Sequence, residues 1–263
     1  MPRFAANLSM MYNEVPFMER FARAAADGFV GVEYLFPYDF EAEKIKEQLN
    51  ENGLCQALFN APPGDWAKGE RGIASLPGRE KEFRASIEKA LHYAKVLDCK
   101  TIHIMSGNRV PLMLRDHQLS ILKNNIALAC DMALQGGVTI VLEPINLRSM
   151  PEYFLNRQDE AQAIVRELNR TNLAVQFDFF HCQIGEGDVT TRLMRDLPTI
   201  GHIQIASVPE RHEPDAGELN YPWIFEKLDQ IGYGGWVGCE YIPAGETSAG
   251  LGWFAPWKAG QKR

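Results

Sequence analysis

The stretch TIVLEPIN, residues 139–146, indicates the kind of fold this chain adopts. A short run that favours a buried strand leads directly into Glu143, and Pro144 follows at once. Short apolar runs with β-branched residues are typical of strands in a protein core. Glu143 therefore stands where a buried strand is expected to end, and the rest of the chain must explain an acidic side chain at that point.

The same strand-like unit recurs along the whole chain, with helical patterns between the repeats. The expected strands cover residues 4–9, 31–36, 54–60, 101–107, 138–144, 173–178, 202–206 and 235–241. The expected helices cover residues 16–28, 41–53, 78–99, 117–135, 158–169, 189–196 and 221–232. Strands that alternate with helices predict a parallel sheet, and eight of them predict an α/β fold of the (β/α)8, or TIM-barrel, type.

No linker or change in composition divides the chain, so we expect a single domain over residues 1–263. A doubly wound open sheet is the alternative, but it would need fewer strands and usually a glycine-rich first turn, which NLSMMYNEVP lacks. Residues 61–77, APPGDWAKGERGIASLP, interrupt the pattern and predict a long loop after the third strand. A loop of this length in a compact domain is typically functional, and here it is a candidate lid over a substrate.

Composition excludes several classes of protein. Of 263 residues, 46% are hydrophobic and 23% charged, which is ordinary for a globular protein. The net charge of −7 and the lack of a Lys/Arg-rich run argue against a nucleic-acid partner, and no apolar run is long enough to span a membrane. Five scattered cysteines without a C-x-x-C pair fit reduced thiols. A soluble, cytoplasmic protein is therefore expected.

Four successive expected strands carry an oxygen-bearing side chain at or near their carboxyl ends. These side chains are Glu143, Asp178, Gln204 and Glu240. The carboxyl ends of barrel strands meet at one rim, where TIM-barrel active sites lie. Carboxylates crowded there would repel one another, and a bound cation is the simplest relief. Three carboxylates and an amide oxygen suit Mg²⁺ or Mn²⁺ better than Zn²⁺.

His181 follows Asp178 by three residues, in DFFH. It is either a solvent-facing loop residue or a group that hydrogen-bonds the substrate or orients a metal ligand. His103 alternates with apolar residues and is a weaker candidate for the barrel interior. No lysine ends an expected strand, which argues against a Schiff-base enzyme.

Several strings, taken together and in order, resemble the hydroxypyruvate isomerase family of xylose isomerase-like barrels. They are FAANLSMMY, VEYLFPYDF, GDWAKGERGIASLPGRE, LEPIN, FDFFH, HIQIASVPERHEPDAGELNYPW, GCEYIP and GLGWF. The 2-oxo-tetronate isomerases form a sister group that shares most of these motifs. The chain has EYIP where either group is expected to have EYKP, which removes any role for a lysine at Ile242.

The resemblance implies that the four rim residues hold a divalent metal and that Glu143 and Glu240 also act as proton donor and acceptor. The implied reaction interconverts hydroxypyruvate and tartronate semialdehyde (2-hydroxy-3-oxopropanoate) through a metal-stabilised enediolate. A 2-oxo-tetronate isomerase and a ketose 3-epimerase are the alternatives on the same metal site. A zinc-dependent apurinic-site endonuclease and a non-catalytic barrel are less well supported.

A small keto or aldehyde substrate of this class carries a carboxylate, which the acidic rim would repel. Some cation should offset that repulsion. The candidates are Arg71 in the long loop, Arg79 just after it, and Arg211 in PERHEP, together with His181 as a hydrogen-bonding group. The resemblance also implies self-association into a homo-oligomer.

Overall fold

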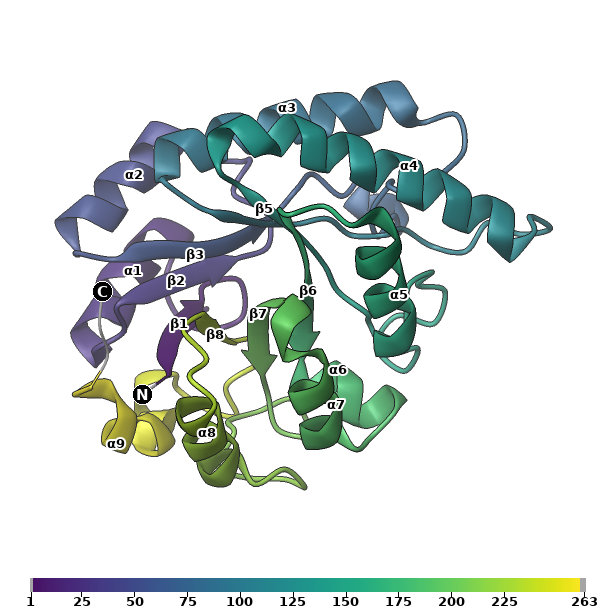
Figure 1. Ribbon diagram of the computed structural model, residues 1–263. Helices are drawn as coiled ribbons and strands as arrows, with labels where there is room; N and C mark the ends of the chain where they lie inside the picture. The colour runs from purple at the N-terminus through teal and green to yellow at the C-terminus, as the bar shows by residue number, and fades with distance from the viewer. Residues whose placement is uncertain (1, 261–263) are drawn as a thin grey trace.

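The computed structural model describes residues 2–260, and its strands form a closed parallel barrel in the order β1 to β8. The strands are β1 (Arg3–Asn7), β2 (Gly31–Tyr34), β3 (Cys55–Asn60), β4 (Thr101–His103), β5 (Thr139–Leu142), β6 (Leu173–Asp178), β7 (Ile200–Ile205) and β8 (Trp236–Cys239). Figure 1 shows the helices arranged around the outside of these strands. The predicted (β/α)8 barrel is confirmed.

Helices surround the barrel, and most of them turn buried apolar residues toward it. They are α1 (Phe17–Asp27), α2 (Ala42–Glu51), α3 (Glu80–Leu97), α4 (Arg115–Ala133), α5 (Gln158–Leu168), α6 (Phe179–Gly185), α7 (Val189–Asp196), α8 (Tyr221–Gln230) and α9 (Ala255–Lys258). Helix α1 illustrates the pattern: Phe21 and Ala24 face the core, and Gly28 ends the helix in the left-handed conformation at φ 100°. No helix within residues 2–260 has the length and apolar content to span a membrane.

The sequence predicts the element order well but misses two regions. Helix α6 begins immediately after β6, where the sequence suggested a loop, and the chain continues after β8 into η4 (Ser248–Phe254) and α9. Strand β4 ends at His103, shorter than the predicted run to residue 107. The thiol of Cys239 is buried in β8, and burial raises its pKa, as expected for a core residue.

The loop between β3 and α3 is anchored to its neighbours. It contains one short turn, η1 (Trp66–Lys68), and Gly72 there adopts φ 103° with its Cα against the backbone of Met105, where a side chain would clash. The backbone N–H of Gly107 donates to the carbonyl of Arg71. The predicted loop is therefore present and is tied to the segment after β4, while its role as a lid stays a prediction.

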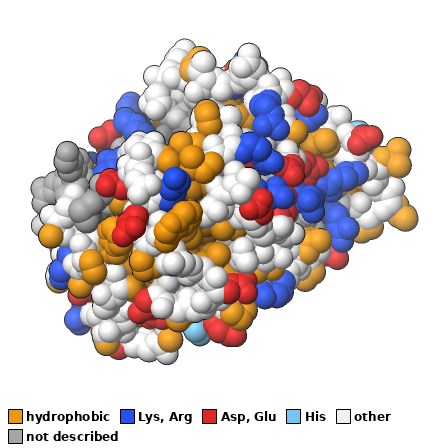
Figure 2. Space-filling model, turned by 60° about the horizontal axis from the view of Figure 1, so that its bottom comes forward, with side chains coloured by type: hydrophobic (Ala, Val, Ile, Leu, Met, Phe, Trp, Pro, Cys, Tyr) orange, Lys and Arg blue, Asp and Glu red, His pale blue; other side chains and the backbone are white. Residues whose placement is uncertain are grey.

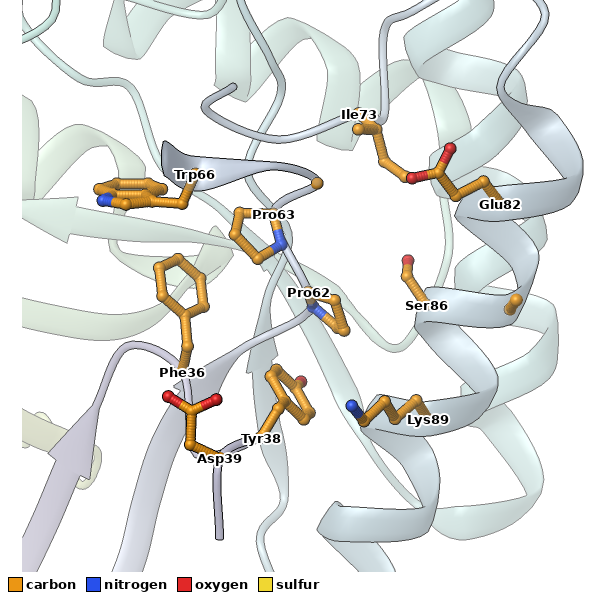
Figure 3. Close-up of a pocket in the computed structure, with 12 residues that line it drawn as sticks. Phe36, Tyr38, Asp39, Pro62, Pro63, Trp66, Ile73, Glu82, Ser86 and Lys89 are labelled. Carbon is orange, nitrogen blue, oxygen red and sulfur yellow. The ribbon is translucent and has the colours of Figure 1, made fainter. Parts of the chain in front are cut away.

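The long loop also forms one wall of a pocket of about 620 Å³ between the segment after β2 and helix α3. Figure 3 shows Phe36 and Trp66 on one side of this pocket, side chains of α3 on the other, and Pro62 and Pro63 between them. None of its lining residues belongs to the four rim positions singled out in the sequence. The pocket thus does not include the predicted metal ligands.

Candidate active site

Three carboxylates meet inside the mouth of the barrel. Glu143 directly follows β5, Asp178 ends β6, and Glu240 directly follows β8. With His181 they form a buried group in which one potential ligand atom of each residue lies within 4.8 Å of the others. The structure therefore brings together three of the four rim residues predicted as metal ligands, and adds the histidine beside them.

Local structure fixes how each carboxylate is presented. Asp178 caps helix α6: its Oδ1 accepts the backbone N–H groups of Phe180, at 2.7 Å, and His181, at 3.4 Å. Because Oδ1 is occupied by the cap, Oδ2 is left to face the barrel mouth. The two oxygens of Asp178 therefore have different roles. One caps helix α6, which the hydrophobic pattern did not reveal, and the other faces the acidic group.

Two buried oxygens of this group lack a hydrogen-bond partner among residues 2–260. They are Oε1 of Glu143 and Oδ2 of Asp178. Buried polar atoms in proteins are nearly always paired, so each unpaired oxygen calls for a ligand. Carboxylate oxygens that face one another in a buried site are the donor set that a hard divalent cation prefers, so the residues present fit such an ion.

Electrostatics lead to the same conclusion. Burial, followed by repulsion from Glu240 and Asp178, raises the pKa of Glu143 well above its usual value. Burial outweighs the opposing effect of Arg211 and raises the pKa of Asp178 to about 6 and that of Glu240 to about 8. Without a cation, then, some of these carboxyl groups hold protons near neutral pH.

His181 faces the carboxylates as a hydrogen-bond donor. The backbone N–H of Ser149 donates to Oδ1 of Asn146, so the Asn146 amide nitrogen must face Nδ1 of His181, 2.7 Å away. Burial lowers the pKa of His181, so the ring is neutral. Its single proton therefore sits on Nε2, which lies 3.6 Å from Oδ2 of Asp178. This tautomer fits the predicted substrate-binding role better than metal ligation.

Gln204, the fourth predicted ligand, lies on β7 in register with Asp178 on β6. Its Oε1 accepts the amide of Gln176 at 2.6 Å, and its Nε2 donates to Glu33 at 2.8 Å. An amide oxygen has two lone pairs, so one remains for a cation. Its role as a ligand stays a prediction.

The three candidate arginines occupy different surroundings. Arg211 lies closest to the acidic group: it donates to Oε2 of Glu240 and lies 3.9 Å from Oδ2 of Asp178. Arg71 stacks over the ring of Trp66 in the long loop, 3.9 Å from the ring centre. Arg79 forms ion pairs with Glu70 in the long loop and Glu82 in α3. Of these three, only Arg211 contacts the acidic group.

Sequence reasoning passed over several polar residues inside the barrel. Glu33, Gln176 and His202 are buried on β2, β6 and β7, and Asn7 is buried at the end of β1. His103, ranked low from the sequence, is also buried, with Nδ1 3.2 Å from Oδ1 of Asn60 and 3.7 Å from Oε2 of Glu143. Each of these polar residues lies among mostly apolar residues, and this contrast is the sequence signal that could have identified it.

Comparison with known proteins identifies the family. Residues 21–257 match the family described as xylose isomerase-like TIM barrel, and the chain belongs to that family. It is 59% identical over 257 residues to the 2-oxo-tetronate isomerase of Cupriavidus necator, covering 98% of this chain and 99% of the relative. It is 41% identical over 259 residues to the hydroxypyruvate isomerase of Escherichia coli, covering 98% and 100%.

A crystal structure from Brucella melitensis, described as an AP endonuclease of family 2, is 54% identical and superposes with a TM-score of 0.96. The match covers 98% of this chain and 99% of that one. With the full-length matches above, the protein is an isomerase of the group that contains the 2-oxo-tetronate and hydroxypyruvate isomerases. The predicted family resemblance is confirmed.

Proposed function

We propose that this protein isomerises a 2-oxo-tetronate, a four-carbon sugar acid, by moving the carbonyl group from C2 to C3. The observation that carries this proposal is the 59% identity, over nearly the full length of both chains, to a 2-oxo-tetronate isomerase. Hydroxypyruvate, favoured from the sequence motifs, becomes the second candidate substrate, because the hydroxypyruvate isomerase relative is 41% identical.

The acidic group supports a divalent metal as cofactor, held by Glu143, Asp178, Glu240 and, from the sequence, Gln204. The unpaired buried oxygens of Glu143 and Asp178 are the main support. An all-oxygen set of this kind favours Mg²⁺ or Mn²⁺. When bound, such a cation would stabilise the negative charge that develops on the substrate oxygens as a carbon-bound proton leaves.

Glu143 and Glu240 would move the protons. In the proposed reaction, one glutamate takes the proton from C3 and a proton is delivered to C2, while the hydroxyl proton at O3 is lost and one is gained at O2. The atoms therefore balance without a further reactant. A metal-bound carboxylate is ionised, and its second oxygen would take or deliver the proton.

Arg211 is the best-placed cation for the substrate carboxylate. It lies in the mouth of the barrel, its guanidinium is 4.8 Å from the centre of the Phe180 ring, and it already interacts with two carboxylates. The Nε2–H of His181 would donate to a substrate oxygen. Arg71 would contribute if the long loop closes over the substrate, whereas the two carboxylates that Arg79 contacts, Glu70 and Glu82, are not part of the acidic group.

Other readings have less support. An apurinic-site endonuclease needs several histidine ligands and a basic DNA-binding face, whereas the acidic group here contains one histidine and the chain has a net charge of −7. Figure 2 shows acidic side chains interspersed with basic ones on the face in view. Surface arginines also form ion pairs, such as Arg109 with Glu152 at 3.1 Å. A cytoplasmic location and a homo-oligomer remain predictions from the sequence.

A substrate panel tests this proposal. The metal-stripped enzyme, supplied with Mg²⁺ or with Mn²⁺, is assayed on 2-oxo-tetronates, hydroxypyruvate and neutral ketoses. We expect kcat/KM to be highest on a 2-oxo-tetronate and to depend on the added metal. A higher kcat/KM on hydroxypyruvate would reverse the order of the two candidates, and turnover of neutral ketoses alone would refute the acid substrate.

A further inference from the structure

Glu33 is a fully buried carboxylate in the barrel interior that the proposed reaction does not use. Three groups surround its two oxygens. The Nδ2 of Asn7 lies at 3.0 Å, the Nε2 of His202 at 2.7 Å and the Nε2 of Gln204 at 2.8 Å. The two amide nitrogens can only donate, so Glu33 acts as an acceptor at the centre of a polar network.

A glycine on strand β8 leaves room for this carboxylate. Gly238 on β8 pairs in register with Gln204 on β7, and a Cβ at position 238 would overlap the carboxyl group of Glu33. A glycine in a buried strand costs stability and often marks a place where another group must approach closely. The gap beside Gln204 thus accommodates the Glu33 side chain.

The network fixes the orientation of two amide groups. If the Gln204 amide were reversed, its oxygen would face the Glu33 carboxylate and its NH₂ group would face the NH₂ group of Gln176, 2.6 Å away in the observed pairing. On the other side, Oδ1 of Asn7 accepts the backbone N–H of Ser9 at 3.1 Å, which turns its NH₂ group toward Glu33. That same NH₂ group lies 3.4 Å from Oε1 of Glu240.

We propose that Glu33 is a positioning residue for the metal site: it holds the amide of Gln204 so that the oxygen, not the nitrogen, faces the cation. The inference rests on the proposed function, because it takes Gln204 as a ligand. Partners of this kind, one step behind the metal ligands, typically change metal affinity 10- to 100-fold when they are replaced.

Two simpler roles make different predictions. If Glu33 only stabilises the fold through His202, its replacement would lower the melting temperature but leave the metal affinity of the folded protein unchanged. If Glu33 only adds negative charge near the cation, any variant that keeps the charge would keep the affinity. Orientation of Gln204 requires both the charge and the reach of a glutamate.

The test measures Mn²⁺ affinity of the metal-stripped, full-length chain by titration calorimetry or by the EPR signal of free Mn²⁺. The variants are Glu33→Gln, Glu33→Asp and the exchange Glu33→Gln/Gln204→Glu, with Glu88→Gln on the exposed face of α3 as a charge-matched control. Circular dichroism and the melting temperature identify the folded variants.

We expect Glu33→Gln and Glu33→Asp each to bind Mn²⁺ about 10- to 100-fold more weakly, and the control to bind as the wild type does. The exchange keeps the total charge, and a carboxylate at position 204 has two equivalent oxygens, so its orientation no longer matters. We therefore expect the exchange to bind within a few-fold of the wild type.

Wild-type affinity in Glu33→Gln or in Glu33→Asp would overturn the orienting role, as would a folded exchange variant that binds no tighter than Glu33→Gln. If Glu33→Gln does not fold, wild-type affinity in Glu33→Asp would overturn the orienting role, as would a folded exchange variant that binds no tighter than Glu33→Asp. A wild-type chain that binds no Mn²⁺ would overturn the metal site of the proposed function as well, so the two failures are distinguishable.

Discussion

Removing the metal and raising the pH from about 6.5 to 8 should destabilise the protein. Burial raises the pKa of Glu143 and raises that of Glu240 to about 8, from an ordinary value of 4.5. The folded metal-free chain therefore binds more protons in this range than the unfolded chain. Linkage then requires the free energy of unfolding to fall as the pH rises.

The size of this effect follows from the number of excess protons. Each pH unit costs about 1.4 kcal/mol per excess proton, so 1.5 units cost about 2 kcal/mol for one carboxyl group and up to about 4 kcal/mol for two. For a chain of this length, 1 kcal/mol corresponds to about 2–4 °C in melting temperature. The expected loss in melting temperature is thus about 4–16 °C.

The lower limit of pH 6.5 separates these carboxyl groups from two histidines. Burial lowers the pKa of His103 to about 3 and also lowers that of His181. The folded state then binds fewer protons at these rings than the unfolded state, so their contribution makes stability rise with pH through the ordinary histidine pKa of about 6.5 and fades above it. Above that pH the carboxyl groups dominate the comparison.

Melting temperatures recorded with EDTA and with saturating Mn²⁺ at four pH values between 6.5 and 8 test this reasoning. With Mn²⁺ the carboxylates are already ionised in the complex, so their contribution to the slope should disappear. The variant Glu143→Gln/Glu240→Gln, which cannot ionise at these positions, should show little of the slope even without metal. A metal-free wild type whose melting temperature stays constant or rises from pH 6.5 to 8 would refute the account.

Three further outcomes follow from the site. Arg211→Met should raise KM for a 2-oxo acid about 10- to 100-fold in steady-state assays, because the substrate carboxylate loses a charge-assisted hydrogen bond. An unchanged KM would show that another group binds the carboxylate. Deletion of residues 64–72 in the long loop should lower kcat while Mn²⁺ affinity by calorimetry stays the same, and unchanged kinetics would remove its role as a lid. Saturation with Mn²⁺ at about 100 times Kd should stabilise the wild type by about 2.7 kcal/mol, measured in urea unfolding, and no stabilisation would argue against the metal site.

The order of strands and helices could be predicted because each element carries its own local signal. Short apolar runs alternate with helical patterns, and Gly28 marks the end of α1 where the sequence places it. Helix α6 could not be predicted in this way, because it is only seven residues long and its exposed and buried positions do not form a clear stripe. Its start depends on the capping of Phe180 and His181 by Asp178.

The site was predictable in part for a similar reason. Glu143, Asp178 and Glu240 lie at strand ends, and barrel topology alone brings such positions together. Glu33 was not identified, since its proposed role depends on contacts across the barrel with His202 and Gln204, about 170 positions away in the chain. The orientation of His181 likewise depends on Asn146, whose side chain reaches it from another segment.

The most direct test of the central claim is proton NMR of a 2-oxo-tetronate incubated with the enzyme and Mg²⁺ in D₂O. If a glutamate removes a carbon-bound proton, the C3–H signal should disappear as the 3-oxo isomer forms, and the new C2 position should carry deuterium. Glu143→Gln and Glu240→Gln should slow this exchange by about 100-fold or more. Exchange at the wild-type rate in both variants, or no exchange and no isomer with the wild type, would contradict the account.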